Sequence, residues 1–374
     1  MLRVLHLDTG EEMRGGQRQL LMLATALRRD GHDQLVACPE GSALAAEAAK
    51  GGLECWTAPL RRRASLAAMG RLRRVIVRGG YEIVHAHDGR GQTLSWLASC
   101  RLPVCRVASR RVTFLPRSHT LHRFKYTYTC NGVIAVSCFI RGLLVDSGVP
   151  PRLIEVIPDG VVIPALLPSP EQRAELRRKW QFEPNHFVIG HVGAFTAEKG
   201  QSILLEAFDL VAKVLPQARL LLAGDGPLRE RLEVQWRSHT AGHRVRFLGY
   251  MEDLTSVMDS LDLFVMPSLK EGLGSAAIVA MAHGVPVVAA CAGGLPEVVE
   301  HQKTGWLVPP ANAPALASAV EVAESNRERT LQFGKNARER AALFSDDIMA
   351  KRTIDFYMRL LARPEGDPRC DCEL

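Results

Sequence analysis

Two loops of this 374-residue chain place a charged side chain beside glycines, just ahead of a segment with helical periodicity. Residues 193–200 end in Lys199-Gly200, and a lysine at a helix start can meet a diphosphate as a point charge. The second loop carries Glu271, followed by Gly272, Leu273, Gly274 and Ser275. Its carboxylate suits sugar hydroxyls or developing positive charge, and its backbone amides suit phosphate oxygens. Together the loops predict a site for a ligand with a sugar and a phosphate, although the lysine alone also fits a solvated loop position.

A third glycine-rich turn follows the first expected strand. Arg14-Gly15-Gly16-Gln17 precedes a helical pattern, and paired glycines let backbone amides approach a phosphate closely. The same pair also fits a plain strand-to-helix turn, so both interpretations stay open. Residues 223–227 lack the full G-x-G-x-x-G spacing, and we interpret them as a structural turn with Pro227 at the first helical position.

Short apolar runs alternate with longer amphipathic ones along the whole chain. Strands are expected at 4–7, 34–38, 82–86, 104–108, 133–136, 187–192, 219–223, 245–248, 263–266, 286–290 and 305–308. Helices are expected between them, among others at 17–29, 66–78, 202–214, 228–238 and 275–283. Strands joined by helical crossovers predict parallel sheets covered on both faces, with ligands beyond the carboxyl ends of the strands.

A proline-rich stretch, residues 158–170, divides the two series of strands. The sequence therefore predicts an α/β fold with two doubly wound, Rossmann-like domains that face each other across a cleft. We place the first domain at 1–165 and the second at 166–345. Residues 346–374 are expected to form a helix that packs back toward the first domain, followed by a tail.

The net charge of +7 is unevenly spread. Residues 1–165 hold 23 lysines and arginines against 13 acidic residues, a net of +10, whereas the remainder is slightly acidic. A basic half attracts anionic partners such as phosphates, an acidic glycan or a membrane surface. Nucleic acid is not expected as a partner, because no helix-turn-helix, zinc-finger or RNA-binding signature accompanies the charge.

Much of this positive charge surrounds the expected helix 66–78. Three arginines precede the helix, namely Arg61, Arg62 and Arg63, and four lie on it, namely Arg71, Arg73, Arg74 and Arg78. The apolar stripe of the helix is Leu66, Met69, Leu72 and Ile76. One interpretation is that the stripe packs on the sheet and the arginines remain solvated. The other is a basic face that docks an anionic, lipid-linked acceptor at the inner membrane surface.

The nine cysteines are odd in number and lie mostly in apolar stretches, which indicates a reducing compartment and buried thiols. Cys370 and Cys372 are interpreted as part of a tail. The uncharged stretch 273–296 is interrupted by glycines and prolines, so it reads as a buried helix, turn and strand. We find no signal peptide and expect a cytoplasmic protein, with the inner face of the cell membrane as a candidate location.

Several of these stretches together resemble the family-4 retaining glycosyltransferases, which have the GT-B fold, in particular the bacterial cell-envelope glycan type. The matching text includes RGGQRQLLMLATALRRDGH, YEIVHAHDGRG, VGAFTAEKGQSILLEAF, LLLAGDGPLRERLE and LDLFVMPSLKEGLGSAAIVAMAHGVPVVAACAGGLPEVV. It extends over residues 2–310 in the family's order. The resemblance implies transfer of a sugar from a nucleoside-diphosphate donor to a glycan or lipid-linked acceptor in polysaccharide or lipopolysaccharide biosynthesis.

The resemblance also implies roles for individual residues. Lys199 would hold the diphosphate, and Glu271 would face the donor sugar. The donor would further contact Gly15, Gly16, Gly272, Leu273, Gly274 and Ser275. No cofactor or metal is expected, because protein groups would stabilise the leaving diphosphate and the sequence offers no D-x-D carboxylate pair in a suitable loop.

Three positions depart from the family pattern. Ala194 stands where an arginine is common, and Arg110 where a histidine ends an amino-terminal strand. Val279 replaces the second glutamate, which normally grips ribose hydroxyls. An enzyme remains the leading hypothesis, since Lys199 and Glu271 are both present. The alternatives are a catalytically silent member that binds nucleotide or glycan and, against the EGLG pattern, a nucleotide-sugar epimerase.

Overall fold

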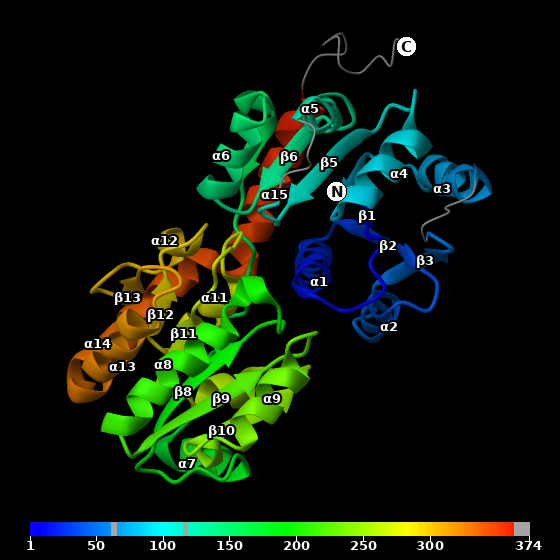
Figure 1. Ribbon diagram of the computed structural model, residues 1–374. Helices are drawn as coiled ribbons and strands as arrows, with labels where there is room; N and C mark the ends of the chain where they lie inside the picture. The colour runs from blue at the N-terminus through cyan, green and yellow to red at the C-terminus, as the bar shows by residue number, and fades with distance from the viewer. Residues whose placement is uncertain (61–65, 115–118, 363–374) are drawn as a thin grey trace. The chain divides into compact units, whose positions relative to one another are not determined.

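A computed structural model describes residues 1–60, 66–114 and 119–362 (Figure 1). The chain divides into two compact units, one formed by Met1–Gly160 with Asp346–Leu374 and the other by Val161–Ser345. Each unit is built on its own parallel β-sheet, so the expected two-domain, doubly wound α/β fold class is confirmed. The division after Gly160 lies within the proline-rich stretch and precedes the expected boundary at 165.

Unit 1 has a seven-stranded sheet in the order β3-β2-β1-β4-β5-β6-β7. The strands are β1 (Arg3–Leu7), β2 (Asp33–Pro39), β3 (Glu54–Ala58), β4 (Ile83–Ala86), β5 (Cys105–Arg110), β6 (Gly132–Ala135) and β7 (Ile154–Val156). The helices are α1 (Gly15–Arg29), α2 (Ala43–Lys50), α3 (Leu66–Gly79), α4 (Gly89–Ser99), α5 (His119–Tyr128), α6 (Cys138–Asp146), η1 (Pro151–Leu153) and α15 (Asp346–Leu361). Strand order reverses between β1 and β4, the position at which doubly wound sheets open a crevice for ligands.

Alternate residues of β1 and β4 in unit 1 point to opposite faces of the sheet and into different hydrophobic clusters. Val4 of β1 and Ile83 of β4 pack with α1 and α15, where Tyr357 is fully buried. Leu5 of β1 and Val84 of β4 point the other way and pack with α3 and α4. This alternation is the period of two that a strand imposes on its side chains.

Unit 2 has a six-stranded sheet in the order β10-β9-β8-β11-β12-β13, with its reversal between β8 and β11. The strands are β8 (Phe187–Val192), β9 (Ala218–Ala223), β10 (Val245–Gly249), β11 (Leu263–Met266), β12 (Val287–Ala290) and β13 (Gly305–Val308). The longer helices are α7 (Pro170–Lys179), α8 (Gln201–Val214), α9 (Arg229–Arg237), α11 (Ser275–Ala282), α13 (Ala313–Ser325) and α14 (Arg327–Ala341). Short helical turns are η2 (Ala197–Lys199), η3 (Gly242–Arg244), α10 (Thr255–Ser260), α12 (Leu295–Val298) and η4 (Ala342–Phe344).

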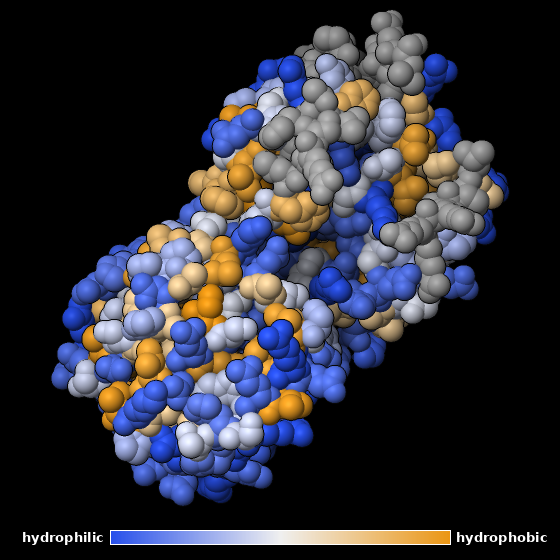
Figure 2. Space-filling model, viewed as in Figure 1, coloured by the Kyte–Doolittle hydropathy of each residue, from blue (hydrophilic) through white to orange (hydrophobic). Residues whose placement is uncertain are grey.

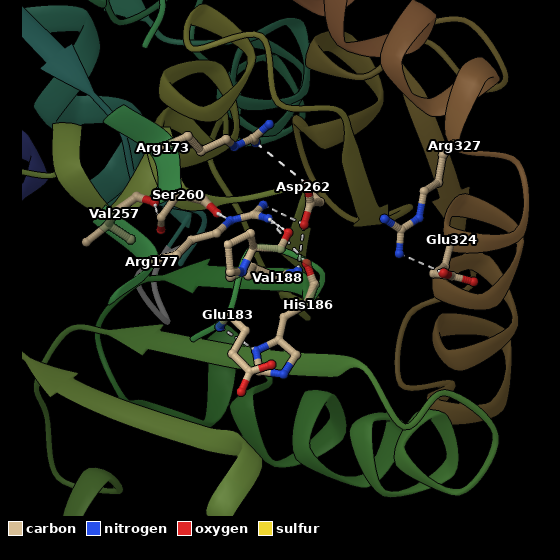
Figure 3. A network of polar contacts seen from close by, with 11 residues as sticks. Arg173, Arg177, Glu183, His186, Val188, Val257, Ser260, Asp262, Glu324 and Arg327 are labelled. Carbon is tan, nitrogen blue, oxygen red and sulfur yellow. Dashed lines mark hydrogen bonds and ion pairs between the residues drawn. The ribbon is translucent and has the colours of Figure 1, made fainter. Parts of the chain in front are cut away.

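A buried arginine fastens α7 to the amino-terminal edge of the unit 2 sheet (Figure 3). Arg177 pairs with Asp262 at 2.7 Å, and its Nε donates to the Ser260 carbonyl at 3.0 Å. Its Nη1 donates to the carbonyls of Pro184 and His186. These contacts tie the loops that lead into β8 and β11, so the register of the two central strands is set at the edge opposite their carboxyl ends.

Two expectations from the sequence were wrong, one about the start of a helix and one about the burial of the cysteines. Helix α9 begins at Arg229 rather than at Pro227, because the turn before it is held by the backbone of Phe195. The Phe195 amide donates to the Asp225 carbonyl at 2.9 Å, and the Leu228 amide donates to the Phe195 carbonyl at 3.1 Å. The expected thiol burial fails at Cys291, which directly follows β12 where the chain leaves the core, and at Cys138 in unit 1.

The remaining described cysteines are buried or half-buried, and all seven described cysteines are free thiols. The terminal pair Cys370 and Cys372 lies outside the described residues. None of the helices that the structure describes is both long and apolar enough to cross a bilayer. Hydrophilic and hydrophobic residues are intermixed over the visible surface (Figure 2).

Candidate functional site

The reversal of strand order in unit 2 brings two loops together. Residues 193–200 follow β8 and lead into α8, and residues 267–274 follow β11 and lead into α11. Because the strands are parallel, both loops lie at the carboxyl edge of the sheet, where ligands of doubly wound domains bind. The two loops singled out in the sequence are therefore neighbours.

Lys199 and Glu271 form an ion pair between these loops. Lys199 Nζ lies 2.7 Å from Glu271 Oε2, and the two side chains are 26% and 12% exposed. A partly buried pair is screened less by water and salt than a surface pair. Each charge therefore orients the other, and both remain accessible to a ligand.

The backbone of Gly200 makes this approach possible. Gly200 has φ +70°, and a Cβ there would lie 2.2 Å from the carbonyl oxygen of Pro267. Only glycine fits this combination of a left-handed conformation and a backbone contact. The amide of Leu269 also donates to the carbonyl of Glu198 at 2.8 Å, so main-chain contacts join the loops directly behind the ion pair.

Two adjacent glycines, Gly293 and Gly294, contact the backbone of Glu271. A Cβ on Gly293, which has φ +59°, would lie 1.8 Å from the Glu271 carbonyl oxygen, and the Gly294 amide donates to that oxygen at 3.2 Å. We did not single out these two glycines in the sequence as site residues. The signal was available, because a glycine pair directly after strand 286–290 is a position where a backbone approaches closely.

Helix α11 directs its amino-terminal end toward the same site. It begins at Ser275, and its N-cap, Gly274, has φ +101° and supplies no side-chain cap. The amino-terminal end of a helix carries partial positive charge and favours an anion. Gly272, Leu273 and Gly274 are buried in front of it, whereas Ser275 is half-buried.

Val279 lies one turn after Ser275 on the less buried side of α11. Both residues are half-buried, whereas Ile278 and Ala280 beside Val279 are fully buried. A side chain at 279 therefore reaches the surface near the start of the helix, yet valine offers no hydrogen-bond acceptor. The departure noted in the sequence thus falls on an accessible position.

Behind the loops, a buried histidine and glutamine hold the strand ends together. His191 Nδ1 donates to the Val265 carbonyl at 2.9 Å, which joins β8 to β11. Burial lowers the pKa of His191 to about 4, so the ring is neutral at physiological pH. Gln201 Nε2 lies 3.2 Å from His191 Nε2 and donates to the Ala194 carbonyl at 2.8 Å. This pair could not be predicted from the sequence, since no motif or spacing connects residues 191 and 201.

The predicted glycine loop Gly15-Gly16 belongs to unit 1, whereas the residues described above belong to unit 2. Helix α1 begins at Gly15, and a Cβ on either glycine would meet no atom within 4 Å. Gln17 accepts from the Arg14 amide at 3.2 Å and donates to Asp8 at 2.8 Å, so the loop is anchored from behind. The glycines leave the start of α1 uncovered by side chains, as an anion-binding turn requires.

Asp8 and Asp88 mark the carboxyl ends of β1 and β4, at the reversal in unit 1. Asp88 accepts from Thr9 Oγ1 at 2.6 Å and from the amides of Arg90 and Gly91 at the start of α4. Burial, and then the neighbouring charge of Asp88, raise the pKa of Asp8. This pair was not identified in the sequence, because an aspartate after a strand is common at helix caps.

Three buried histidines, His6, His85 and His87, cluster on β1 and at the end of β4 close enough to share a metal ion. Their nitrogens are engaged in hydrogen bonds instead. His6 contacts Gln34 at 2.8 Å and His87 at 3.0 Å, and His85 contacts Tyr357 at 2.6 Å. Burial lowers the pKa of His6 to about 4 and holds the pKa values of His85 and His87 well below the usual range. We therefore assign the cluster a structural role as a neutral hydrogen-bonded network.

Comparison with known proteins agrees with this geometry. Residues 13–163 match the family model described as Glycosyltransferase Family 4, and residues 172–340 match Glycosyl transferases group 1. An uncharacterised glycosyltransferase of Methanocaldococcus jannaschii is 30% identical over 74% of this chain and 75% of that protein. The chain belongs to the family-4 glycosyltransferases.

Two further relatives extend the comparison. A GDP-mannose-dependent phosphatidylinositol monomannoside mannosyltransferase of Mycobacterium tuberculosis is 30% identical over 60% of this chain and 60% of its own length. The Anabaena protein HepE, solved with UDP, with UDP and glucose, and with UDP-glucose, is 24% to 25% identical. The match covers 96% of this glycosyltransferase and 100% of HepE, with TM-scores of 0.82 to 0.84, and it supports the GT-B fold.

We expect substitution of either member of the ion pair to impair glycosyl transfer. Lys199→Ala and Glu271→Ala should each lower kcat by about 100-fold or more, since each removes a preorganised charge from the reacting centre. Steady-state kinetics measures the effect, with the donor selected by the panel described under Proposed function. Lys213→Ala, which breaks an exposed pair with Asp209 on α8, is the matched control and should retain full activity. Near-normal turnover in either site variant would contradict the assignment.

Proposed function

We propose that this glycosyltransferase moves a sugar from a nucleoside-diphosphate donor to a glycan or lipid-linked acceptor, with retention of anomeric configuration and without a metal ion. The proposed setting is the biosynthesis of cell-envelope polysaccharide or lipopolysaccharide. The Lys199–Glu271 ion pair at the carboxyl edge of unit 2 is the observation that carries the proposal.

The proposed chemistry follows from charge. Cleavage of the bond between sugar and phosphate leaves negative charge on the diphosphate and positive charge on the sugar ring. Lys199 and the amino-terminal end of α11 would stabilise the former, as preorganised donors do. Glu271 would accept hydrogen bonds from sugar hydroxyls or stabilise the ring. Because these groups supply the charge that a metal would otherwise provide, the mechanism requires no divalent cation.

The relatives support a nucleotide sugar as donor. HepE was solved with UDP-glucose, and the mycobacterial relative is named for its dependence on GDP-mannose. The chain spans about 60% of the length of that mannosyltransferase, so its activity is a proposal for this protein. A uridine or guanosine diphosphate sugar is therefore the first choice for testing.

A donor panel tests the proposed function. Release of UDP or GDP from UDP-glucose, UDP-galactose, UDP-N-acetylglucosamine and GDP-mannose is measured with and without a glycan acceptor. We expect release from one donor, increased by the acceptor and unchanged by EDTA. Absence of release from all four donors and from UDP-glucuronic acid would contradict the transferase, and loss of activity in EDTA would contradict the metal-independent mechanism.

Val279 favours a second candidate function, that of a silent member that binds a nucleotide or glycan without turnover. If position 279 faces the ribose, Val279→Glu should tighten binding of the cognate nucleotide, because a buried hydroxyl without an acceptor costs about 1–3 kcal/mol. Calorimetry should show a roughly 10-fold lower Kd, and Val234→Glu on an exposed site of α9 is the control. Unchanged or weaker binding would mean that the ribose is held elsewhere.

The acceptor side of the proposal concerns α3. Leu72 and Ile76 are buried in the core, which fits the first interpretation of its apolar stripe. Arg73 was wrongly assigned to the basic face, because its Nη1 donates to the carbonyls of Ala98 and Cys100 at the end of α4. Arg61, Arg62 and Arg63 lie outside the described residues.

Three arginines of α3 still form an exposed basic surface. Arg71, Arg74 and Arg78 line a groove of about 460 Å³ together with Trp56 and Tyr81. Arginine and tryptophan side chains are the types that peripheral proteins present to a bilayer surface. We propose that this surface docks the enzyme beside an anionic, lipid-linked acceptor at the inner face of the cell membrane.

Vesicle flotation tests the docking surface. At low salt the protein should bind vesicles with anionic lipid and not neutral ones, since each basic residue near such a surface contributes about 1 kcal/mol. Replacement of Arg71, Arg74 and Arg78 by glutamine should abolish binding, whereas glutamine at the exposed Arg101, Arg123 and Arg141 should not. Equal binding to both vesicle types would leave a soluble acceptor as the proposal.

A further inference from the structure

Two successive arginines, Arg110 at the end of β5 and Arg111 directly after it, have charges with different surroundings. Arg111 Nε lies 2.8 Å from Asp159 Oδ1, and both side chains are largely buried, so the charge of Arg111 is neutralised. Its Nη1 also lies 3.5 Å from His87 Nδ1. Arg111 is therefore committed to holding the end of β4 and the segment after β7.

Arg110 has no such counter-charge among the described residues. It is the last residue of β5 and only 8% exposed. Its Nη1 lies 3.4 Å from the Tyr126 hydroxyl, its Nη2 donates to the Phe114 carbonyl, and its guanidinium lies 5.0 Å from the centre of the Phe114 ring. Within residues 1–60, 66–114 and 119–362, no carboxylate forms an ion pair with it.

This environment is unusual for a buried cation. Neutral partners fix the orientation of the guanidinium without cancelling its charge, and a buried charge is costly unless an opposite charge accompanies it. The burial of Arg110 also shows that it is not a solvated surface arginine. An anionic ligand bound at this position would supply the counter-charge that Arg110 lacks among the described residues.

The position of Arg110 is one where a ligand is expected. It lies at the carboxyl edge of the unit 1 sheet, beside the end of β4. Lys125 lies nearby, with its Nζ 2.5 Å from the Gly89 carbonyl. Burial lowers the pKa of Lys125, the charge of Asp88 opposes this effect, and the charge of Arg110 adds to it, so two cations and the carboxylate of Asp88 share this edge. A planar guanidinium recognises carboxylate or phosphate through two parallel hydrogen bonds.

We propose that Arg110 binds a carboxylate or phosphate group carried by one of the substrates of this glycosyltransferase. The inference rests on the proposed function for its substrates, and it narrows their class to anionic sugars or anionic acceptors. The group can belong to a uronic acid donor or to a phosphorylated acceptor, and the experiment separates the two.

A binding measurement with inorganic phosphate tests the anion site directly. The Lys199→Ala background removes the expected diphosphate contact in unit 2. In that background phosphate should raise Tm, and the additional change Arg110→Met should reduce this increase, whereas Arg141→Met on the exposed surface of α6 should not. Circular dichroism verifies that each variant folds. If Arg110→Met does not fold, Arg110→Lys is used in its place, because it keeps the positive charge but lacks the planar guanidinium. Equal increases in all variants would overturn the proposal.

Kinetics with paired substrates identify the source of the anion. The donors are UDP-glucose and UDP-glucuronic acid, and the acceptors are methyl glucoside and its 6-phosphate. Arg110→Lys and Arg110→Met should lower kcat/KM by about 10- to 100-fold for the charged member of one pair, relative to its neutral counterpart. Equal losses for both members of each pair would indicate a structural role and overturn the proposal. If the wild-type enzyme transfers from no donor, the proposed function fails, and the phosphate measurement still decides whether Arg110 binds an anion.

Discussion

The site in unit 2 depends on close contacts between backbones at the carboxyl edge of a parallel sheet. Gly200 lies against the Pro267 carbonyl, and Gly293 lies against the Glu271 carbonyl, with no room for a side chain at either contact. Because the loops meet through main chain, the Lys199 and Glu271 side chains project from them with a fixed separation. The positions of the two charged side chains therefore depend on two glycines, Gly200 and Gly293, that have no reactive groups of their own.

Most of the fold could be predicted from the sequence, because apolar runs alternate with amphipathic helices throughout. Strands β3 and β7 were missed, since β3 is a half-exposed edge strand and β7 has only three residues. The proximity of Lys199 and Glu271 followed from parallel topology, whereas the role of Gly293 required coordinates. Arg110 shows the limit most clearly, because its surroundings include Tyr126, which lies 16 residues further along the chain and which no local pattern connects to it.

The buried polar side chains at the carboxyl edges of the two sheets form different hydrogen-bond networks. At the carboxyl edge of the unit 2 sheet, His191 bonds the Val265 carbonyl and pairs with Gln201, and both side chains are neutral. In unit 1, histidines of β1 and β4 form a longer neutral network, flanked by carboxylates and arginines. Burial keeps the histidines uncharged, so the charges at this edge come from Asp8, Asp88, Lys125 and the two arginines at and just after the end of β5. The character of unit 1 toward a ligand is thus set by a few residues at strand ends.

The placement of α15 in the core of unit 1 has a consequence for how the chain is made. Val161–Ser345 is continuous in sequence, so unit 2 can complete its core without a segment from elsewhere in the chain. Unit 1 cannot complete its core until α15 has been made, because Phe356 and Tyr357 of that helix fill it. The part of unit 1 that precedes Val161 is synthesised before α15, and its apolar surface stays uncovered until then. Chaperone dependence and loss by carboxyl-terminal truncation should therefore concentrate on unit 1.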